Sequence, residues 1–305
     1  MQPIYQHRRT DLAVEAKELW AESAAETTEL QGVKAEDKTS HGYDVTVVQI
    51  LDQAGERALG KPQGTYITVE LGALARREAD AFERGVASLR EQLLPLLNLG
   101  PDDTVLVVGL GNRAITPDAI GPVTAKHTLA TRHLVEQAPE HFGNFRQVSV
   151  VQTGVLGTTG LESAEMVKAL SQKFRPDRIV AVDALASRKL SRVCRTVQLS
   201  DTGIAPGSGV GNSRAKLDKD TLGVPVIAVG VPTVVDAGTL AADLLEESGQ
   251  PGTPPEQFSA FGGGMIVTPK EIDTQVADIS KLVGYALNCT FHDGLTVADV
   301  DMLTS

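Results

Sequence analysis

The spacing of apolar residues changes several times along this chain, and each change predicts a different element. Two alternating runs, 44–51 and 65–71, predict a pair of strands with a glycine- and proline-rich loop between them. The next stripe steps by four, three and four residues over 82–93, which is typical of an amphipathic helix. The first forty residues are polar, and an Ala/Glu-rich stretch at 19–30 predicts a helix on a mobile arm outside the core.

From residue 104 onward, continuous apolar runs alternate with helical patterns. We expect strands at 105–108, 148–152, 179–182, 196–199 and 225–229, and helices near 122–137, 162–174, 237–247 and 272–287. Continuous apolar strands are typical of a parallel sheet that is covered on both faces. The predicted fold class is therefore α/β: a mostly parallel twisted sheet with helices on both faces, plus an N-terminal strand pair and a mobile N-terminal arm.

Two helix starts in this region match the capping-box pattern. Thr159 with Glu162 and Thr268 with Glu271 have the required spacing, and Pro269 would occupy the first helical position of the second helix. The domain organisation that follows is an N-terminal arm with a helix at 12–43 and a single α/β domain at 44–305.

Charge and cysteine content narrow the function classes. The 305 residues include 28 Lys and Arg against 39 Asp and Glu, a net charge of -11, which disfavours direct binding of nucleic acid. Two cysteines provide neither a disulfide framework nor a metal cluster. No apolar run approaches the roughly 20 residues of a membrane span, and the N-terminus lacks the apolar stretch of a signal peptide. We expect a cytoplasmic enzyme or protein-binding module with no membrane contact.

Two aspartates follow apolar strands, where α/β sheets form their sites. Asp118 lies between two prolines beyond the strand at 105–108, and Asp183 directly follows the strand at 179–182. Alone, each would be a turn or cap residue. Together, two carboxylates that converge at one sheet edge could share one proton and act as base and acid.

Glycine-rich segments provide weaker candidates. Gly109-Leu110-Gly111 imitates a dinucleotide fingerprint, but Pro117 and Pro122 delay the helix, and no acid stands at the distance that a ribose contact needs. A nucleotide-binding regulator therefore remains only an alternative. The loop with Gly207, Gly209 and Gly211 lacks the lysine of a P-loop and could instead receive an extended peptide.

Other patterns suggest no metal and no cofactor. Asp201-Thr202-Gly203 spells the triplet of pepsin-like proteases, but it occurs once and inside an α/β pattern, so we interpret it as coincidental and place Asp201 at the rim of the site. The histidines have no zinc-binding spacing.

Eight ordered blocks together resemble the germination protease, or spore endopeptidase, of spore-forming bacteria, which is distantly similar to the hydrogenase maturation endopeptidases. The blocks span the chain from the arm to the last long helix: 9–16, 107–112, 116–122, 182–188, 200–203, 206–212, 231–236 and 267–273. One departure is the Gly/Pro-rich stretch 247–264, which is shorter than the family leads us to expect and leaves its role open.

The resemblance implies a homotetrameric endopeptidase, made as an autoprocessed zymogen in the forespore or spore core, that cuts small acid-soluble spore proteins during germination. Nucleic acid would be a partner of the substrate only. The proposed catalytic pair of the family maps onto Asp118 and Asp183. The family has also been classed as metalloproteases, but this sequence offers no ligand set for that class, so we expect an aspartate-dependent enzyme without metal or cofactor. Residues 9–15 resemble the sites that the family cuts, so residues 1–11 would be a propeptide removed between Asp11 and Leu12.

The resemblance also suggests which residues could contact substrate. They are, as an expectation, Gly109, Gly111, Asn112, Asp201, Gly207, Gly209 and Gly211. A catalytically inactive binding scaffold of the same fold is the alternative from a different class.

Overall fold

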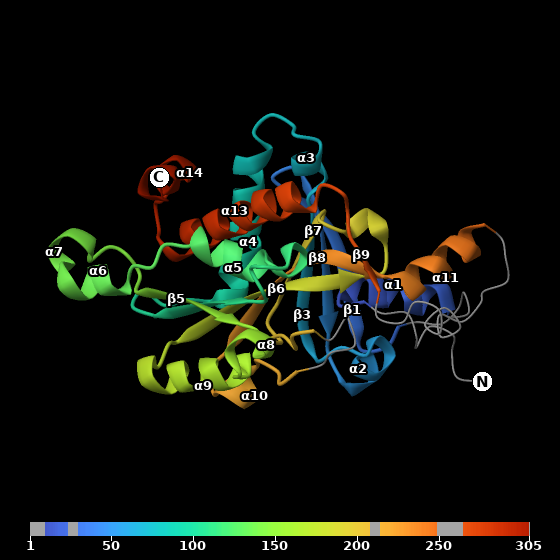
Figure 1. Ribbon diagram of the computed structural model, residues 1–305, viewed down its shortest axis with the longest axis horizontal. Coiled ribbons are helices and arrows are strands. Elements are labelled where there is room, and N and C mark those ends of the chain that lie inside the picture. Colours follow the sequence, from blue (N-terminus) through green and yellow to red (C-terminus); the bar gives the residue numbers. More distant parts are fainter. Residues whose placement is uncertain (1–9, 24–29, 208–213, 249–264, 305) are drawn as a thin grey trace.

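The computed structural model describes residues 10–23, 30–207, 214–248 and 265–304. Within these residues one mixed sheet runs in the order β1-β2-β3-β7-β8-β6-β4-β5, and β9 pairs with β8 (Figure 1). The strands are β1 (Val33–Ser40), β2 (Tyr43–Ile50), β3 (Gly64–Glu70), β4 (Val105–Leu110), β5 (Val148–Gly154), β6 (Arg178–Ser187), β7 (Thr196–Ser200), β8 (Val226–Asp236) and β9 (Ile266–Val267).

The parallel part of the sheet consists of β5, β4, β6 and β8, and the remaining pairs are antiparallel. The α/β class is therefore confirmed, with a larger antiparallel share than the sequence predicted. The helices are α1 (Ala13–Ser23), α2 (Gln53–Leu59), α3 (Gly72–Ala75), α4 (Ala81–Leu97), α5 (Ile120–Lys126), α6 (Arg132–Gln137), α7 (Pro139–Phe142), α8 (Leu156–Thr159), α9 (Ser163–Phe174), α10 (Lys219–Leu222), α11 (Ala237–Glu247), α13 (Ile272–Phe291) and α14 (Val297–Thr304).

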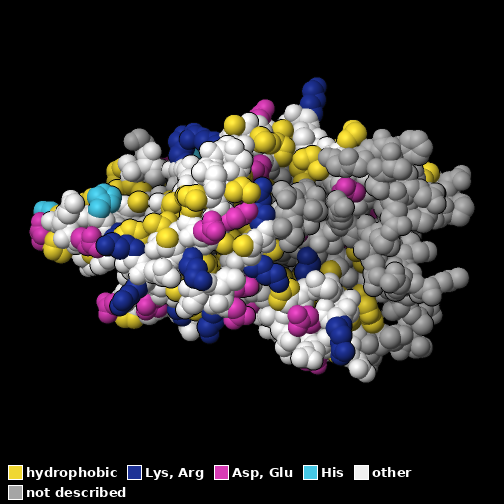
Figure 2. Space-filling view, turned by 60° about the horizontal axis from the view of Figure 1, so that its bottom comes forward, with side chains coloured by type: hydrophobic (Ala, Val, Ile, Leu, Met, Phe, Trp, Pro, Cys, Tyr) yellow, Lys and Arg dark blue, Asp and Glu magenta, His cyan; other side chains and the backbone are white. Residues whose placement is uncertain are grey.

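Helices cover both faces of the sheet. α4, α5 and α13 lie together on one face, and α9 and α10 lie on the other (Figure 1). The larger apolar cluster joins the sheet to α4 and α13 through residues such as Leu89, Leu93, Ile279 and Leu282. On the face that Figure 2 shows, basic and acidic side chains of the described residues are interspersed. No helix in these residues is both long and apolar enough to cross a bilayer.

The expectation that the arm lies outside the core is wrong for its described part. α1 begins at Ala13, six residues earlier than predicted, and its first turn packs on β2 and β3 through Val48 and Tyr66. The burial of α1 was not predicted because its buried positions include Glu15, which resembles a surface residue, and two small alanines beside Val14 and Leu19. β1 was missed because its charged side chains are mostly exposed and show no alternation.

Strands β6 and β8 continue well beyond their predicted ends. The predicted strand 179–182 extends to Ser187, and the predicted strand 225–229 extends to Asp236, because the two strands stay paired as far as Ser187 and Val235. Asp183 consequently lies inside a strand and not after it. The pattern of apolar residues does not predict these extensions, because the continuation of β6 is rich in Ala and Ser and that of β8 contains Pro232.

Other predicted helix boundaries differ from those in the structure because of local contacts. The helix predicted over 122–137 divides into α5 and α6, and the amide of Leu129 between them donates to Asn288 on α13. Neither predicted capping box forms. α9 begins after Glu162, whose amide donates to Glu165, and the Thr268 hydroxyl donates to the carbonyl of Thr233.

Candidate active site

The two predicted aspartates come together because strand β4 ends before its neighbour β6. Pairing between these strands stops at Gly109 and Val182, whereas β6 continues along β8. Beyond that point the loop that follows β4 passes beside β6. The loop carries Asp118, and Asp183 is the first residue of β6 without a partner on β4.

Asp118 ends a short 3-10 helix, Thr116–Asp118, that is held at several points. Its Oδ2 accepts a hydrogen bond of 2.8 Å from the amide of Asn112. The Thr233 hydroxyl on β8 donates to the carbonyl of Pro117 at 2.6 Å. Gly111 has φ +105°, and a Cβ there would lie 2.1 Å from the carbonyl oxygen of Asp118, so only glycine permits this approach.

Asp183 is almost fully buried, with 4% of its surface exposed, and its Oδ1 accepts from the amide of Ala184 at 2.9 Å. Burial, followed by the negative charge of Asp118, raises the pKa of Asp183 well above its ordinary value. Burial also raises the pKa of Asp118, although the amide of Asn112 and the positive charge of Arg214 oppose that shift. The pair can therefore carry one proton between its members at pH values where isolated aspartates are both ionised.

Both carboxylates line one cavity of about 210 Å³. Gly207 and Arg214 also line it, and so does Asp11 from the N-terminal segment. A carboxylate base, a carboxylic acid and a nearby cation around one cavity can activate a water molecule for attack on a carbonyl group.

A second cavity, of about 570 Å³, adjoins the same N-terminal segment and is lined by Gln198 and Lys61 among others. Asp11 lines both cavities. Its backbone amide donates to the carbonyl of Ala186 at 2.9 Å, and its Oδ2 accepts from the amide of Ala186 at 2.8 Å. The segment thus lies along the end of β6, three residues beyond Asp183.

The glycines and polar residues predicted to contact substrate have different positions. Gly207 lines the cavity of the two aspartates, and Gly111 does so too. Gly109 is buried inside β4, where a Cβ would lie 2.5 Å from the carbonyl oxygen of Gly121, so its position is explained by packing. Asn112 holds Asp118 through its amide. Gly209 and Gly211 fall outside the described residues.

Asp201 does not line the cavity of Asp118 and Asp183. Its Oδ1 accepts from the amide of Thr65 at 2.8 Å, and its own amide donates back to the Thr65 carbonyl. It lies at the second cavity, beside Gln198. The coincidental interpretation of its triplet remains a prediction.

Sequence reasoning missed three residues at the site: Arg214, Thr233 and Gln198. Arg214 follows a glycine-rich loop and belongs to no motif. Thr233 lies in the part of β8 beyond the predicted end of that strand. Gln198 lies in a strand whose position was predicted, but one glutamine in an apolar strand gives no functional signal. Among the described residues, no three His, Cys, Asp or Glu side chains gather closely enough to hold a metal ion.

A family model, curated relatives and a solved structure match this chain. The model of the germination protease family, Peptidase_A25, matches residues 13–248. The chain is 42% identical to the germination protease of Caldanaerobacter subterraneus subsp. tengcongensis, over 97% of each chain. It is 41% identical to that of Clostridium tetani, over 96% of this chain and 98% of the relative. A solved hydrogenase maturation protease, HycI from Thermococcus kodakarensis, aligns with a TM-score of 0.35 and 18% identity, over 64% of this chain and 98% of its own.

Proposed function

The chain belongs to the germination protease family, and from this premise we propose that it is an endopeptidase that begins the degradation of small acid-soluble spore proteins during germination. It acts as a homotetramer in the cytoplasm of the forespore or spore core and is made as a zymogen. The names of the relatives support the statement that the chain is a protease that acts in germination. The resemblance of the sequence blocks to the family supports the proposed substrate, the zymogen form and the tetrameric state.

We propose that Asp118 and Asp183 are the catalytic pair. The single observation that carries this proposal is their shared cavity, in which burial raises the pKa of both carboxyl groups. A water molecule between them loses a proton to the ionised carboxylate as its oxygen attacks the scissile carbonyl carbon.

The sequence alone left the acid and base roles open, and the different surroundings of the two groups favour one assignment. Asp183 is the more deeply buried and faces the charge of Asp118, so it keeps the shared proton. Asp118 receives the amide of Asn112 and faces Arg214, which both favour its ionised form. We therefore assign Asp118 as the base and Asp183 as the acid.

Removal of residues 1–11 would convert the zymogen to the active form. This part of the proposal is supported by the position of Asp11 at the cavity of the two aspartates, and by the extended contacts of its backbone with Ala186. Matured protein should begin at Leu12 when its N-terminus is sequenced, and an active form that still begins at Met1 would contradict the proposal.

The decisive experiment incubates a purified small acid-soluble spore protein with the chain and its Asp118→Asn and Asp183→Asn variants. Each variant should lose roughly 10³-fold in rate, the range of general acid and base catalysis, while its oligomeric state stays unchanged. Asp278→Asn, at an exposed position of α13 that lines neither cavity, is the matched control and should cleave normally. Substantial activity in both site variants would refute the catalytic pair.

The same incubation distinguishes the other candidate functions. Limited cuts in the spore protein identify an enzyme, and an intact spore protein retained in a complex identifies a binding scaffold. Nucleotide binding without any effect on the spore protein would favour the regulator built on Gly109-Leu110-Gly111.

A further inference from the structure

We infer that Gln198 is a further catalytic residue, whose side-chain amide donates a hydrogen bond to the oxygen of the scissile carbonyl. The inference rests on the proposed function, because it takes the bond between Asp11 and Leu12 as a bond that the site cuts. It adds a role that the catalytic pair leaves unfilled, the stabilisation of negative charge on the carbonyl oxygen.

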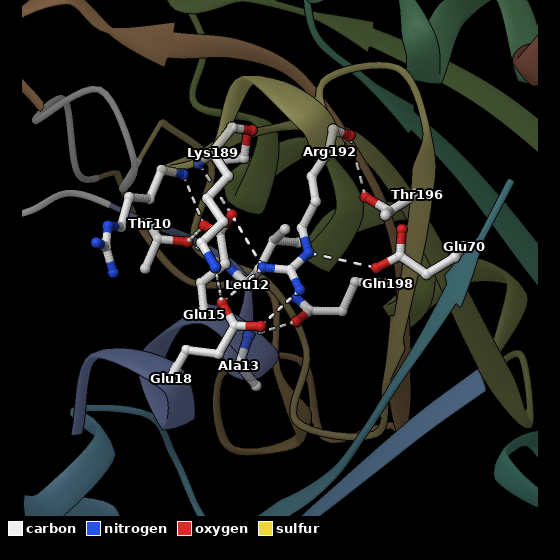
Figure 3. A network of polar contacts seen from close by, with 12 residues as sticks. Thr10, Leu12, Ala13, Glu15, Glu18, Glu70, Lys189, Arg192, Thr196 and Gln198 are labelled. Carbon is white, nitrogen blue, oxygen red and sulfur yellow. Dashed lines mark hydrogen bonds and ion pairs between the residues drawn. The ribbon is translucent and has the colours of Figure 1, made fainter. Parts of the chain in front are cut away.

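Gln198 contacts the backbone on both sides of that bond, and Figure 3 shows its side chain beside Ala13. Its Nε2 donates to the carbonyl oxygen of Asp11 at 3.1 Å, and its Oε1 accepts from the amide of Ala13 at 2.7 Å. The second contact fixes the orientation of the side chain, because only the oxygen end can accept from an N–H group. The nitrogen end must therefore face the carbonyl of Asp11.

The position of Gln198 keeps its side chain fixed, as a hydrogen-bond donor to a developing oxyanion must be. It lies in β7, which pairs with β3 on one side and β8 on the other, at Thr68 and Gly230. Only 8% of its surface is exposed. A donor that is fixed in a site of low water content stabilises a developing oxyanion more strongly than a mobile donor in water.

The peptide segment is held in register on either side of the bond. Before it, the Lys61 ammonium donates to the carbonyl of Thr10 at 3.0 Å. After it, Leu12 is fully buried and packs near Leu185 and Ile204. These contacts place an acidic residue and then an aliphatic residue next to Gln198, and a protein substrate with that order could make the same contacts.

The two cavities separate the reacting groups. Asp118 and Asp183 line one, Gln198 lines the other, and Asp11 lines both. The carbonyl oxygen of Asp11 accepts from Gln198, and Asp11 shares the other cavity with the carboxylates, so we assign the attack on the carbonyl carbon to the carboxylate side. The protonated carboxyl of Asp183 is then not needed at the oxygen and can serve the leaving nitrogen.

In the resulting step the water oxygen bonds to the carbonyl carbon of Asp11 and its proton passes to Asp118. The carbonyl electron pair moves onto the oxygen, where Gln198 stabilises it. When that pair returns, the bond to the nitrogen of Leu12 breaks, and this nitrogen receives a proton from Asp183. The products are a carboxyl group on Asp11 and an amino group on Leu12.

The test compares self-cleavage of the full chain in Gln198→Glu and Gln198→Met with the unchanged protein. Glutamate keeps the acceptor for Ala13 but removes the donor, and methionine keeps the length without adding charge. The first-order rate of appearance of the Leu12 terminus should fall about 10²- to 10³-fold, as for the loss of one oxyanion donor. Gln137→Glu, an exposed residue of α6, is the matched control and should keep the original rate.

Urea unfolding separates a catalytic role from a structural one. The inference requires that at least one variant keep the unfolding midpoint of the unchanged protein while its cleavage rate falls. An unchanged rate, or a rate that falls only together with the midpoint in both variants, overturns it. Asp118→Asn is run in parallel: if Asp118→Asn is inactive while Gln198→Glu cleaves normally, the inference fails and the proposed function stands, whereas an active Asp118→Asn counts against the proposed catalytic pair.

Discussion

Gly121 lies directly against the backbone of Val182, the residue that precedes Asp183. A Cβ on Gly121 would be 2.4 Å from the carbonyl oxygen of Val182 and 2.2 Å from that of Leu110, distances that real Cβ atoms do not reach. The first turn of α5 therefore touches β4 and β6 where their pairing ends. Because Asp118 precedes α5 by only two residues, this contact fixes one carboxylate beside the other.

Gly121→Ala should therefore move Asp118 away from Asp183. We expect it to lose roughly 1–3 kcal/mol of unfolding free energy, the usual cost of overpacking, because backbone rather than a flexible side chain must move. Proteolytic activity should fall more than this loss of stability explains. Gly157→Ala in α8 is the control, since nothing lies within 4 Å of its Cβ position, and it should stay within about 1 kcal/mol of the original. Urea unfolding and spore-protein cleavage measure both effects, and a fully active Gly121→Ala would contradict this account.

The sequence predicted that Asp118 and Asp183 lie near one sheet edge, because each comes just after an apolar run, and both line one cavity although β6 continues past Asp183. Their catalytic role stays a proposal. Gln198 could not be found, because its role depends on a segment 185 residues away that packs against it. The burial of α1 could not be predicted for the same reason. Glu15 is buried because the amides of Arg188 and Lys189 donate to it, and both residues are distant from it in the sequence.

Asp183→Asn should make the protein more stable at neutral pH although it abolishes cleavage. The pKa of Asp183 is raised in the folded state by burial and by Asp118, so its neutral form stabilises the fold below the unfolded value near 3.8, and this contribution is lost as the pH rises through the raised value. Asparagine stays neutral and can still accept from the amide of Ala184.

The stability gain of Asp183→Asn must therefore depend on pH. Melting temperatures measured from pH 3 to pH 8 should be nearly equal for the two proteins at pH 3, below the unfolded value near 3.8, and higher for the variant at the neutral end. A variant that is less stable at pH 8, or a difference that does not change with pH, would show that Asp183 is not held in its neutral form.

Arg214→Ala should move the pH profile of cleavage upward. The positive charge of Arg214 lowers the pKa of both Asp118 and Asp183, against the larger effect of burial. Without it both values rise, so the base becomes protonated at a higher pH on the acid limb and the acid ionises at a higher pH on the alkaline limb. Arg214→Lys should keep most of the original profile.

The profile of kcat against pH, measured on a spore protein, tests this shift. Lys168→Ala removes an exposed cation from α9, away from the two aspartates, and should leave both limbs in place. A profile of Arg214→Ala that is only lower, without displacement of either limb, would mean that Arg214 contacts substrate and does not tune the carboxylates.

Glu15→Ala should release α1 from the rest of the molecule. The Glu15 side chain is fully buried and accepts from the amides of Arg188 and Lys189 at 2.6 and 3.0 Å, and from Arg192 at 3.4 Å. Its removal leaves these donors unsatisfied and an arginine without one of its buried partners, which typically costs about 3–5 kcal/mol. Glu136→Ala, which breaks an exposed pair with Arg132, should cost less than about 1 kcal/mol.

This network should also keep α1 in place when the pH falls to mildly acidic values. Burial tends to raise the pKa of Glu18, but the hydrogen bonds from Arg192 and Lys189 outweigh burial and lower it to about 2. The contribution of Glu18 to stability is thus present above its unfolded value near 4.5 and is lost only as the pH falls toward 2. Hydrogen exchange should accordingly show α1 protected at pH 6 in the unchanged protein and exposed in Glu15→Ala. Exchange in α1 that already rises between pH 7 and pH 6 would contradict the expected stability of this network.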